Sequence, residues 1–154
     1  MSEDELKQNV LNYLEEHRIL TMATASSNGI PDATALEYAN KGFIVYVSVR
    51  PKSRKVANIK ENPEVFFEIH EDMEITMENV QNLKALQCSA IPEIITKDDE
   101  GFHEAFDVME KKYPVFNRIP REKRVVLQFT PRKIWYLNYK DKMFHRDELN
   151  FQET

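Results

Sequence analysis

Glycine is scarce in this chain: the 154 residues include three, Gly29, Gly42 and Gly101. A Walker loop needs closely spaced glycines, and so does the turn of a dinucleotide-binding fold. Neither motif can be built from glycines this far apart. If the protein binds a phosphorylated ligand, side chains must therefore hold the phosphate.

Cysteine and basic charge are also in short supply. Cys88 is the single cysteine, which excludes an internal disulfide and a cysteine zinc cage. Asp and Glu number 26 against 21 Lys and Arg, and the net charge of -5 argues against general nucleic-acid binding, which needs a basic excess. Because no signal-peptide pattern and no apolar run of about 20 residues is present, we expect a cytoplasmic protein that does not contact membranes.

The composition indicates a single globular domain covering residues 1–154. Hydrophobic residues make up 42% of the chain, enough for a full core, and 31% of the residues are charged. Ser2 and Glu5 form a capping-box pattern that predicts a helix over residues 3–17. Apolar alternation and turn residues predict strands at 19–25, from 31 onward, and at 43–49, 64–70, 83–96, 124–130 and 134–139.

Two further helices are predicted, one after residue 53 and ending at Asn62-Pro63, the other from Asp98 or Asp99 to Tyr113. Residues 71–82 are acidic and read as a loop or irregular edge. Many short strands with few, peripheral helices predict a mainly β (α+β) fold. We expect a barrel of six to seven antiparallel strands in a Greek-key-like order, with an N-terminal helix and two peripheral helices.

The strongest local feature is a basic turn over residues 48–55. It contains four basic side chains and two serines, between the end of a strand and the start of a helix. An arriving phosphate would meet helix amide groups, the Ser53 hydroxyl and the charges of Arg54 and Lys55. The alternative is a solvated basic turn, since such runs are common on protein surfaces. The residues alone leave both interpretations open.

The segment around this turn resembles the FMN-binding split-barrel family of pyridoxamine 5'-phosphate oxidase. The resemblance rests on Ser53-Arg54-Lys55, a short helix, and then Asn62-Pro63-Glu64-Val65, in the context of the preceding strands and turns. It is strongest between residues 19 and 70, while the order of elements agrees over nearly the whole chain. The resemblance implies a split barrel that binds FMN at a homodimer interface.

The same resemblance implies a set of cofactor-binding residues. Ser53, Arg54 and Lys55 would hold the FMN phosphate, and the strand around Ala33 and Thr34 would lie along the isoalloxazine. Val47 and Ser48 stand where the family's next strand contacts the cofactor. No metal site is implied, because the four histidines share no metal-ligand spacing.

The C-terminal part departs from the oxidase pattern. Aligned from Pro131, the oxidase's substrate-phosphate arginine falls on Met143, its flavin-packing tryptophan on Leu137 and its last arginine on Asp147. Methionine cannot replace a bidentate phosphate clamp, so oxidation of pyridoxamine phosphate is not expected. The sequence therefore resembles a divergent member that acts on another small molecule.

Two residues of this region have open roles. Trp135, the single tryptophan, is interpreted first as a barrel-core residue, with a flavin contact as the alternative. His145 is interpreted first as a surface residue, with the alternative that it serves the partner subunit's flavin as a substrate ligand or proton donor.

Two classes of function follow. One is an FMN-dependent oxidoreductase with an unidentified small substrate or electron donor. The other is a non-catalytic flavin- or haem-binding module, acting as a carrier or redox sensor. No catalytic residue is identified for either one.

Overall fold

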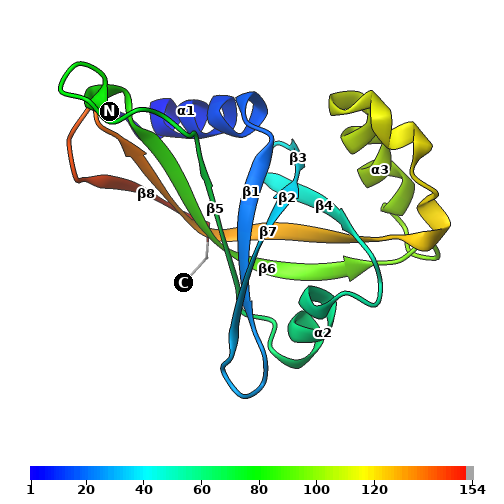
Figure 1. The fold of residues 1–154 in the computed structure, drawn as a ribbon. Coiled ribbons are helices and arrows are strands. Elements are labelled where there is room, and N and C mark those ends of the chain that lie inside the picture. Colours follow the sequence, from blue (N-terminus) through cyan, green and yellow to red (C-terminus); the bar gives the residue numbers. More distant parts are fainter. Residues whose placement is uncertain (152–154) are drawn as a thin grey trace.

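A computed structural model describes residues 1–151 as an eight-stranded antiparallel sheet that curls into a split barrel. The strand order is β2-β1-β5-β6-β7-β4-β3, with β8 pairing with β7, and β6 and β7 cross the direction of β1, β2 and β5 (Figure 1). The expected mainly β class is confirmed, with eight strands in place of six or seven. The strands are β1 (Ile19–Ala25), β2 (Pro31–Glu37), β3 (Ala39–Lys41), β4 (Ile44–Val49), β5 (Val65–His70), β6 (Lys84–Ile95), β7 (Val125–Asn138) and β8 (Arg146–Asn150).

Three α-helices surround the sheet, as expected. They are α1 (Glu3–Glu16), α2 (Arg54–Glu61) and α3 (Phe102–Lys112), and the short 3-10 helices are η1 (Val80–Asn82), η2 (Pro114–Arg118) and η3 (Arg121–Lys123). The capping box at Ser2 and Glu5 is present, since each side chain bonds the other residue's main-chain N–H. Within residues 1–151, no helix is long and apolar enough to cross a membrane.

Two hairpin turns shape the first strands. Gly29 has a φ of 79° and Gly42 a φ of 59°, a left-handed conformation that glycine adopts without steric cost. The first turn fixes the register of β1 and β2, which pair from Ile19 opposite Glu37 to Ala25 opposite Pro31. Both predicted turns are confirmed.

The barrel core is closed at one end by α1, which lies across the strands in Figure 1. Leu6, Val10 and Leu14 of this helix are buried in the main apolar cluster. The Tyr13 hydroxyl donates to the carbonyl of Ile69 at 3.1 Å, so the buried phenol also ties α1 to β5.

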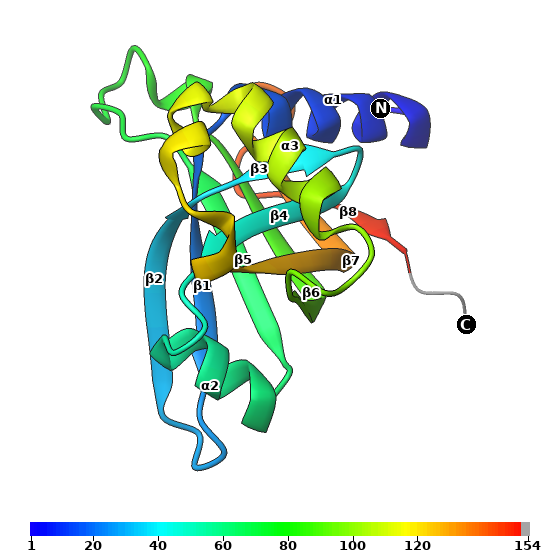
Figure 2. The same ribbon diagram turned by 90° about the vertical axis from the view of Figure 1, so that its right-hand side faces the viewer.

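A second apolar cluster lies outside the barrel, beneath α3. Phe102, Phe106 and Met109 form an apolar stripe at helical spacing on α3 and are fully buried. They pack with Tyr46 of β4 and Val126 of β7, and Figure 2 shows α3 beside β3 and β4. The stripe is thus part of the core.

The C-terminal strands correct the sequence interpretation. Pro131 does not divide two strands; it lies inside β7, opposite Ala90, at a register shift that follows Ser89. A bulge tolerates proline because pairing is locally interrupted there. The strand β8, which the sequence pattern did not predict, pairs with β7.

Candidate functional site

The basic turn connects β4 to α2 and leaves a buried hydroxyl without a partner. Ser53 is the N-cap residue of α2, yet its side chain makes no capping hydrogen bond. Its Oγ is buried and has no hydrogen-bond partner among the described residues. A buried hydroxyl in this state costs about 1–3 kcal/mol, and the first amide groups of a helix also lack intrahelical acceptors. The α2 terminus therefore has donors available for an anion.

Arg54 reaches back from α2 to the start of β2. Its Nε donates to Oδ2 of Asp32 at 2.8 Å and its Nη2 to Oδ1 at 3.2 Å, a bidentate pair. The arginine side chain is 80% exposed and the aspartate 20%, so Asp32 holds the guanidinium over the surface. The hydrogen bond from Arg54 lowers the pKa of Asp32 below its ordinary value. Asp32 was missed in the sequence because no motif links positions this far apart.

A further arginine completes the basic surface at this end of the sheet. Arg124 donates from Nε to Ser48 Oγ at 3.0 Å and from Nη2 to the Ser48 carbonyl at 2.8 Å. The pKa of Arg124 is lowered by burial first and by the nearby charge of Arg50 second. The pairing of Val49 with Val125 brings Arg124 to this position, a long-range register that local sequence does not reveal. The Ser48 side chain is thus already engaged, although its O–H can still donate.

A pocket of about 370 Å³ lies between the β1–β2 hairpin and α2. Asn58 on its wall is buried, and its Nδ2 donates to Thr24 Oγ1 at 3.1 Å, which fixes α2 against β1. The Asp32–Arg54 ion pair lies among the residues that line this pocket. The lining residues are Ser26, Ile30, Pro31, Asp32, Arg54 and Asn58.

The expected flavin strand presents small side chains on the outer face of the barrel. Ala33 is exposed and lies opposite Ala23, whereas Thr34 is half-buried and lies opposite Met22. A flat, small-residue surface can take an aromatic ring at close range. The Val47 side chain is fully buried in the core, so only its main chain is left for a ligand contact.

Trp135 lies on the same outer face as Ala23, because it stacks on Phe66 and Phe66 pairs with Ala23, whereas His145 precedes β8. Trp135 is on the outer face of β7, stacked on Phe66 at 5.4 Å between ring centroids, so its interpretation as a core residue was wrong. The strand alternates, and the neighbours Ile134 and Tyr136 take the inward positions. His145 is exposed and its Nε2 is 3.3 Å from Asp147 Oδ1. Figures 1 and 2 both place β8, the strand that follows His145, away from α2.

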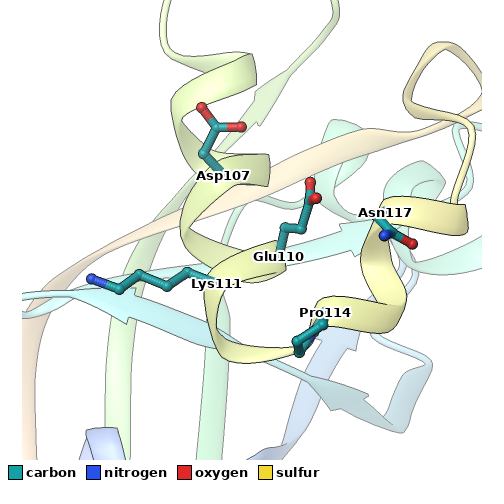
Figure 3. Close-up of a pocket in the computed structure, with 5 residues that line it drawn as sticks. All are labelled: Asp107, Glu110, Lys111, Pro114 and Asn117. Carbon is teal, nitrogen blue, oxygen red and sulfur yellow. The ribbon is translucent and has the colours of Figure 1, made fainter.

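Another surface pocket, of about 360 Å³, lies along α3 and η2 and is shown in Figure 3. Lys111 points away from Glu110 in that view. Arg121 pairs with Asp107 and Glu110, each at 2.9 Å, which satisfies the acidic groups. Among residues 1–151, no group of three or more His, Cys, Asp or Glu side chains is placed to hold a metal ion.

The fold and its helix terminus define a class: split-barrel proteins with a basic turn between a strand and a short helix. Residues 6–138 match the family model described as pyridoxamine 5'-phosphate oxidase. The chain therefore belongs to the pyridoxamine 5'-phosphate oxidase family. No curated protein matches it.

Solved structures share the fold at low sequence identity. A conserved hypothetical protein from Mycobacterium tuberculosis has a TM-score of 0.73 at 21% identity, covering 100% of this chain and 92% of its own. A putative pyridoxamine 5'-phosphate oxidase from Listeria innocua has a TM-score of 0.68 at 19% identity, covering 86% and 98%. HutZ, the heme storage protein from Vibrio cholerae, has a TM-score of 0.68 at 18% identity, covering 84% and 89%. At these identities the likeness shows the fold alone.

Proposed function

We propose that the protein binds FMN, with the phosphate at the N-terminus of α2. The observation that carries this proposal is the buried Ser53 Oγ, which has no partner among the described residues. A phosphate oxygen would accept its hydrogen bond, together with those of the first α2 amides. Arg54 and Lys55 supply the positive charge beside it, so the donor set fits a phosphomonoester.

The isoalloxazine would then lie along the outer face formed by Ala33 and Ala23, with the main chain of Thr34 beside it. A second copy of the chain would cover this face, and Trp135 or His145 of that copy would reach the ring. A homodimer would thus place side chains of the second copy over the flavin ring. Sedimentation as an 18.2 kDa monomer with FMN bound would contradict this arrangement.

We further propose an oxidoreductase that acts on a small molecule other than pyridoxamine phosphate. When bound, the flavin would supply the hydride or electron transfer, and this chain's residues would hold and orient it. Anaerobic addition of NADH or NADPH should bleach the absorbance of the bound flavin. If neither nucleotide nor any other donor bleaches it, the protein is a flavin carrier or sensor.

Titration of FMN fluorescence against the purified protein tests the cofactor site. We expect saturable quenching in the wild type and a loss of at least tenfold in affinity for the double variant Arg54→Ala with Lys55→Ala. Lys60→Ala is the matched control, since Lys60 is an exposed residue at the other end of α2. Equal affinities for all three proteins would show that the basic cluster is only a surface turn.

Haem binding is the second candidate, favoured by the geometry of His70. Its Nδ1 lies 2.8 Å from Glu68 on the outer face of β5, and its Nε2 has no partner among residues 1–151. A carboxylate on one imidazole nitrogen with the other left open is the usual arrangement of a metal-ligating histidine. A Soret band that grows on haemin titration and is lost in His70→Ala would support haem. Absence of that band, with FMN quenching present, would leave flavin as the ligand.

A further inference from the structure

Asp32 is placed so that it opposes the charge on which the proposed phosphate site depends. Its carboxylate takes two donors of the Arg54 guanidinium, Nε at 2.8 Å and Nη2 at 3.2 Å. Nη1 of Arg54 makes no hydrogen bond with any described residue. Asp32 therefore fixes the direction of Arg54 and leaves a donor group free for a ligand, while cancelling much of its positive charge.

The carboxylate cannot move far from this position. Asp32 lies in β2, where it pairs with Thr24 of β1, and its side chain is 20% exposed. An anion bound by Arg54 consequently approaches a fixed negative charge. Arg54 and Lys55 are the cationic groups that act on Asp32, and both come from α2.

We propose that Asp32 is an electrostatic attenuator that makes the phosphorylated flavin exchangeable rather than permanently held. This inference rests on the proposed function, because it assigns a role within the same site. Asp32 orients Arg54, and this favours binding of the phosphate. Its negative charge repels the phosphate, and this opposes binding. The opposing effect grows with ligand charge, since the Coulomb energy is proportional to that charge. An FMN phosphate, with a second pKa near 6, carries nearly two charges at pH 7 and is affected most.

Replacing Asp32 by asparagine separates the two contributions. Asparagine keeps an oxygen acceptor for Arg54 and removes the charge, whereas alanine removes both. We expect Asp32→Asn to tighten FMN binding by about three- to fivefold, the upper part of the range for an exposed charge pair, mainly through slower dissociation. Asp32→Ala should bind FMN more weakly than Asp32→Asn, because Arg54 is then no longer held in direction.

Glu61→Gln is the matched control. Glu61 lies on α2, the helix that carries Arg54, and accepts a hydrogen bond from the main-chain N–H of Ser27 at 3.2 Å. Glu61→Gln therefore also removes one negative charge from the contact between α2 and the β1–β2 hairpin. The readout is the dissociation constant of FMN and of riboflavin for all four proteins, by fluorescence titration at pH 7. Riboflavin has no phosphate, so its affinity should stay within about twofold throughout.

The outcomes separate this inference from the proposed function. Tighter FMN binding in Asp32→Asn, with Glu61→Gln and riboflavin unchanged, supports the attenuator. Equal or weaker FMN binding in Asp32→Asn, with the wild type saturable, overturns the attenuator and leaves the FMN site standing. No FMN binding by the wild type overturns both. A gain for riboflavin as large as that for FMN also overturns the attenuator, because the effect would not depend on phosphate charge.

Discussion

The half-buried ammonium group of Lys112 makes the free energy of unfolding depend on pH. Its Nζ donates to the carbonyls of Leu14 and His17 at the end of α1 and lies 4.4 Å from the centre of the Tyr38 ring. Burial, with a smaller contribution from the charge of Arg18, lowers the pKa of Lys112 from 10.5 to about 8. The perturbation that tests this coupling is Lys112→Met, which keeps the aliphatic stem and removes the charge.

The sign of the effect follows from proton binding. Between pH 8 and 10.5 the unfolded chain keeps a proton that the folded chain has released, so the free energy of unfolding rises with pH in this window. This contribution is present above the unfolded pKa and is lost as pH falls through about 8. The full shift corresponds to about 3 kcal/mol, and solvent screening of a half-buried group reduces the expected rise to about 1–2 kcal/mol.

Urea unfolding from pH 7 to 10 provides the assay. Buried Tyr13 and Tyr38, whose pKa values are raised by burial, titrate in the opposite sense, so the difference between wild type and variant is the measured quantity. We expect the advantage of Lys112→Met over wild type to shrink by about 1–2 kcal/mol across this range. Lys111→Met, an exposed neighbour, should give no such change. Parallel curves for wild type and Lys112→Met would refute the reasoning.

The remaining predictions concern Arg124 and Cys88. Arg124→Ala should weaken FMN binding by about tenfold and lower the free energy of unfolding by about 1 kcal/mol, because the end of β4 loses two hydrogen bonds. Arg124→Lys should restore little of either quantity, since lysine cannot donate to both Ser48 oxygens in one plane. Unchanged FMN affinity in Arg124→Ala would separate this arginine from the site. Cys88 should not react with a thiol reagent at pH 8 in the folded protein and should react fully in denaturant, because burial raises its pKa to about 12. Rapid reaction of the native thiol would contradict its burial.

The first half of the chain was predictable because its structure is set locally. The capping box at Ser2, the hairpins at Gly29 and Gly42, and the stop at Asn62-Pro63 are short-range patterns, and each element appears where its pattern predicts it. The prediction of the C-terminal strands was wrong because their bounds are not set by local patterns. A proline usually ends a strand, so local sequence rules place a strand boundary at Pro131. In the structure the strand continues, because the pairing of β6 with β7 shifts register at Pro131, and this shift depends on contacts between distant segments.

The candidate site was predictable in part. Ser53, Arg54 and Lys55 are neighbours in sequence, so adjacent residues were enough to suggest them as a candidate phosphate-binding turn. Asp32 joins them through an ion pair between β2 and α2, and Arg124 through the pairing of β4 with β7, and neither contact has a local sequence motif. Trp135 was assigned to the wrong side of β7, because apolar character alone does not tell the inner face of a sheet from an outer face covered by Phe66.

The proposed site requires the flavin phosphate to lie at the N-terminus of α2. A crystal structure of the protein grown with excess FMN measures this. We predict a phosphate oxygen within hydrogen-bond distance of Ser53 Oγ, roughly 2.6–3.2 Å, with Arg54 and Lys55 beside it. A structure in which FMN occupies another surface, or in which Ser53 Oγ still has no partner, would contradict the proposed site.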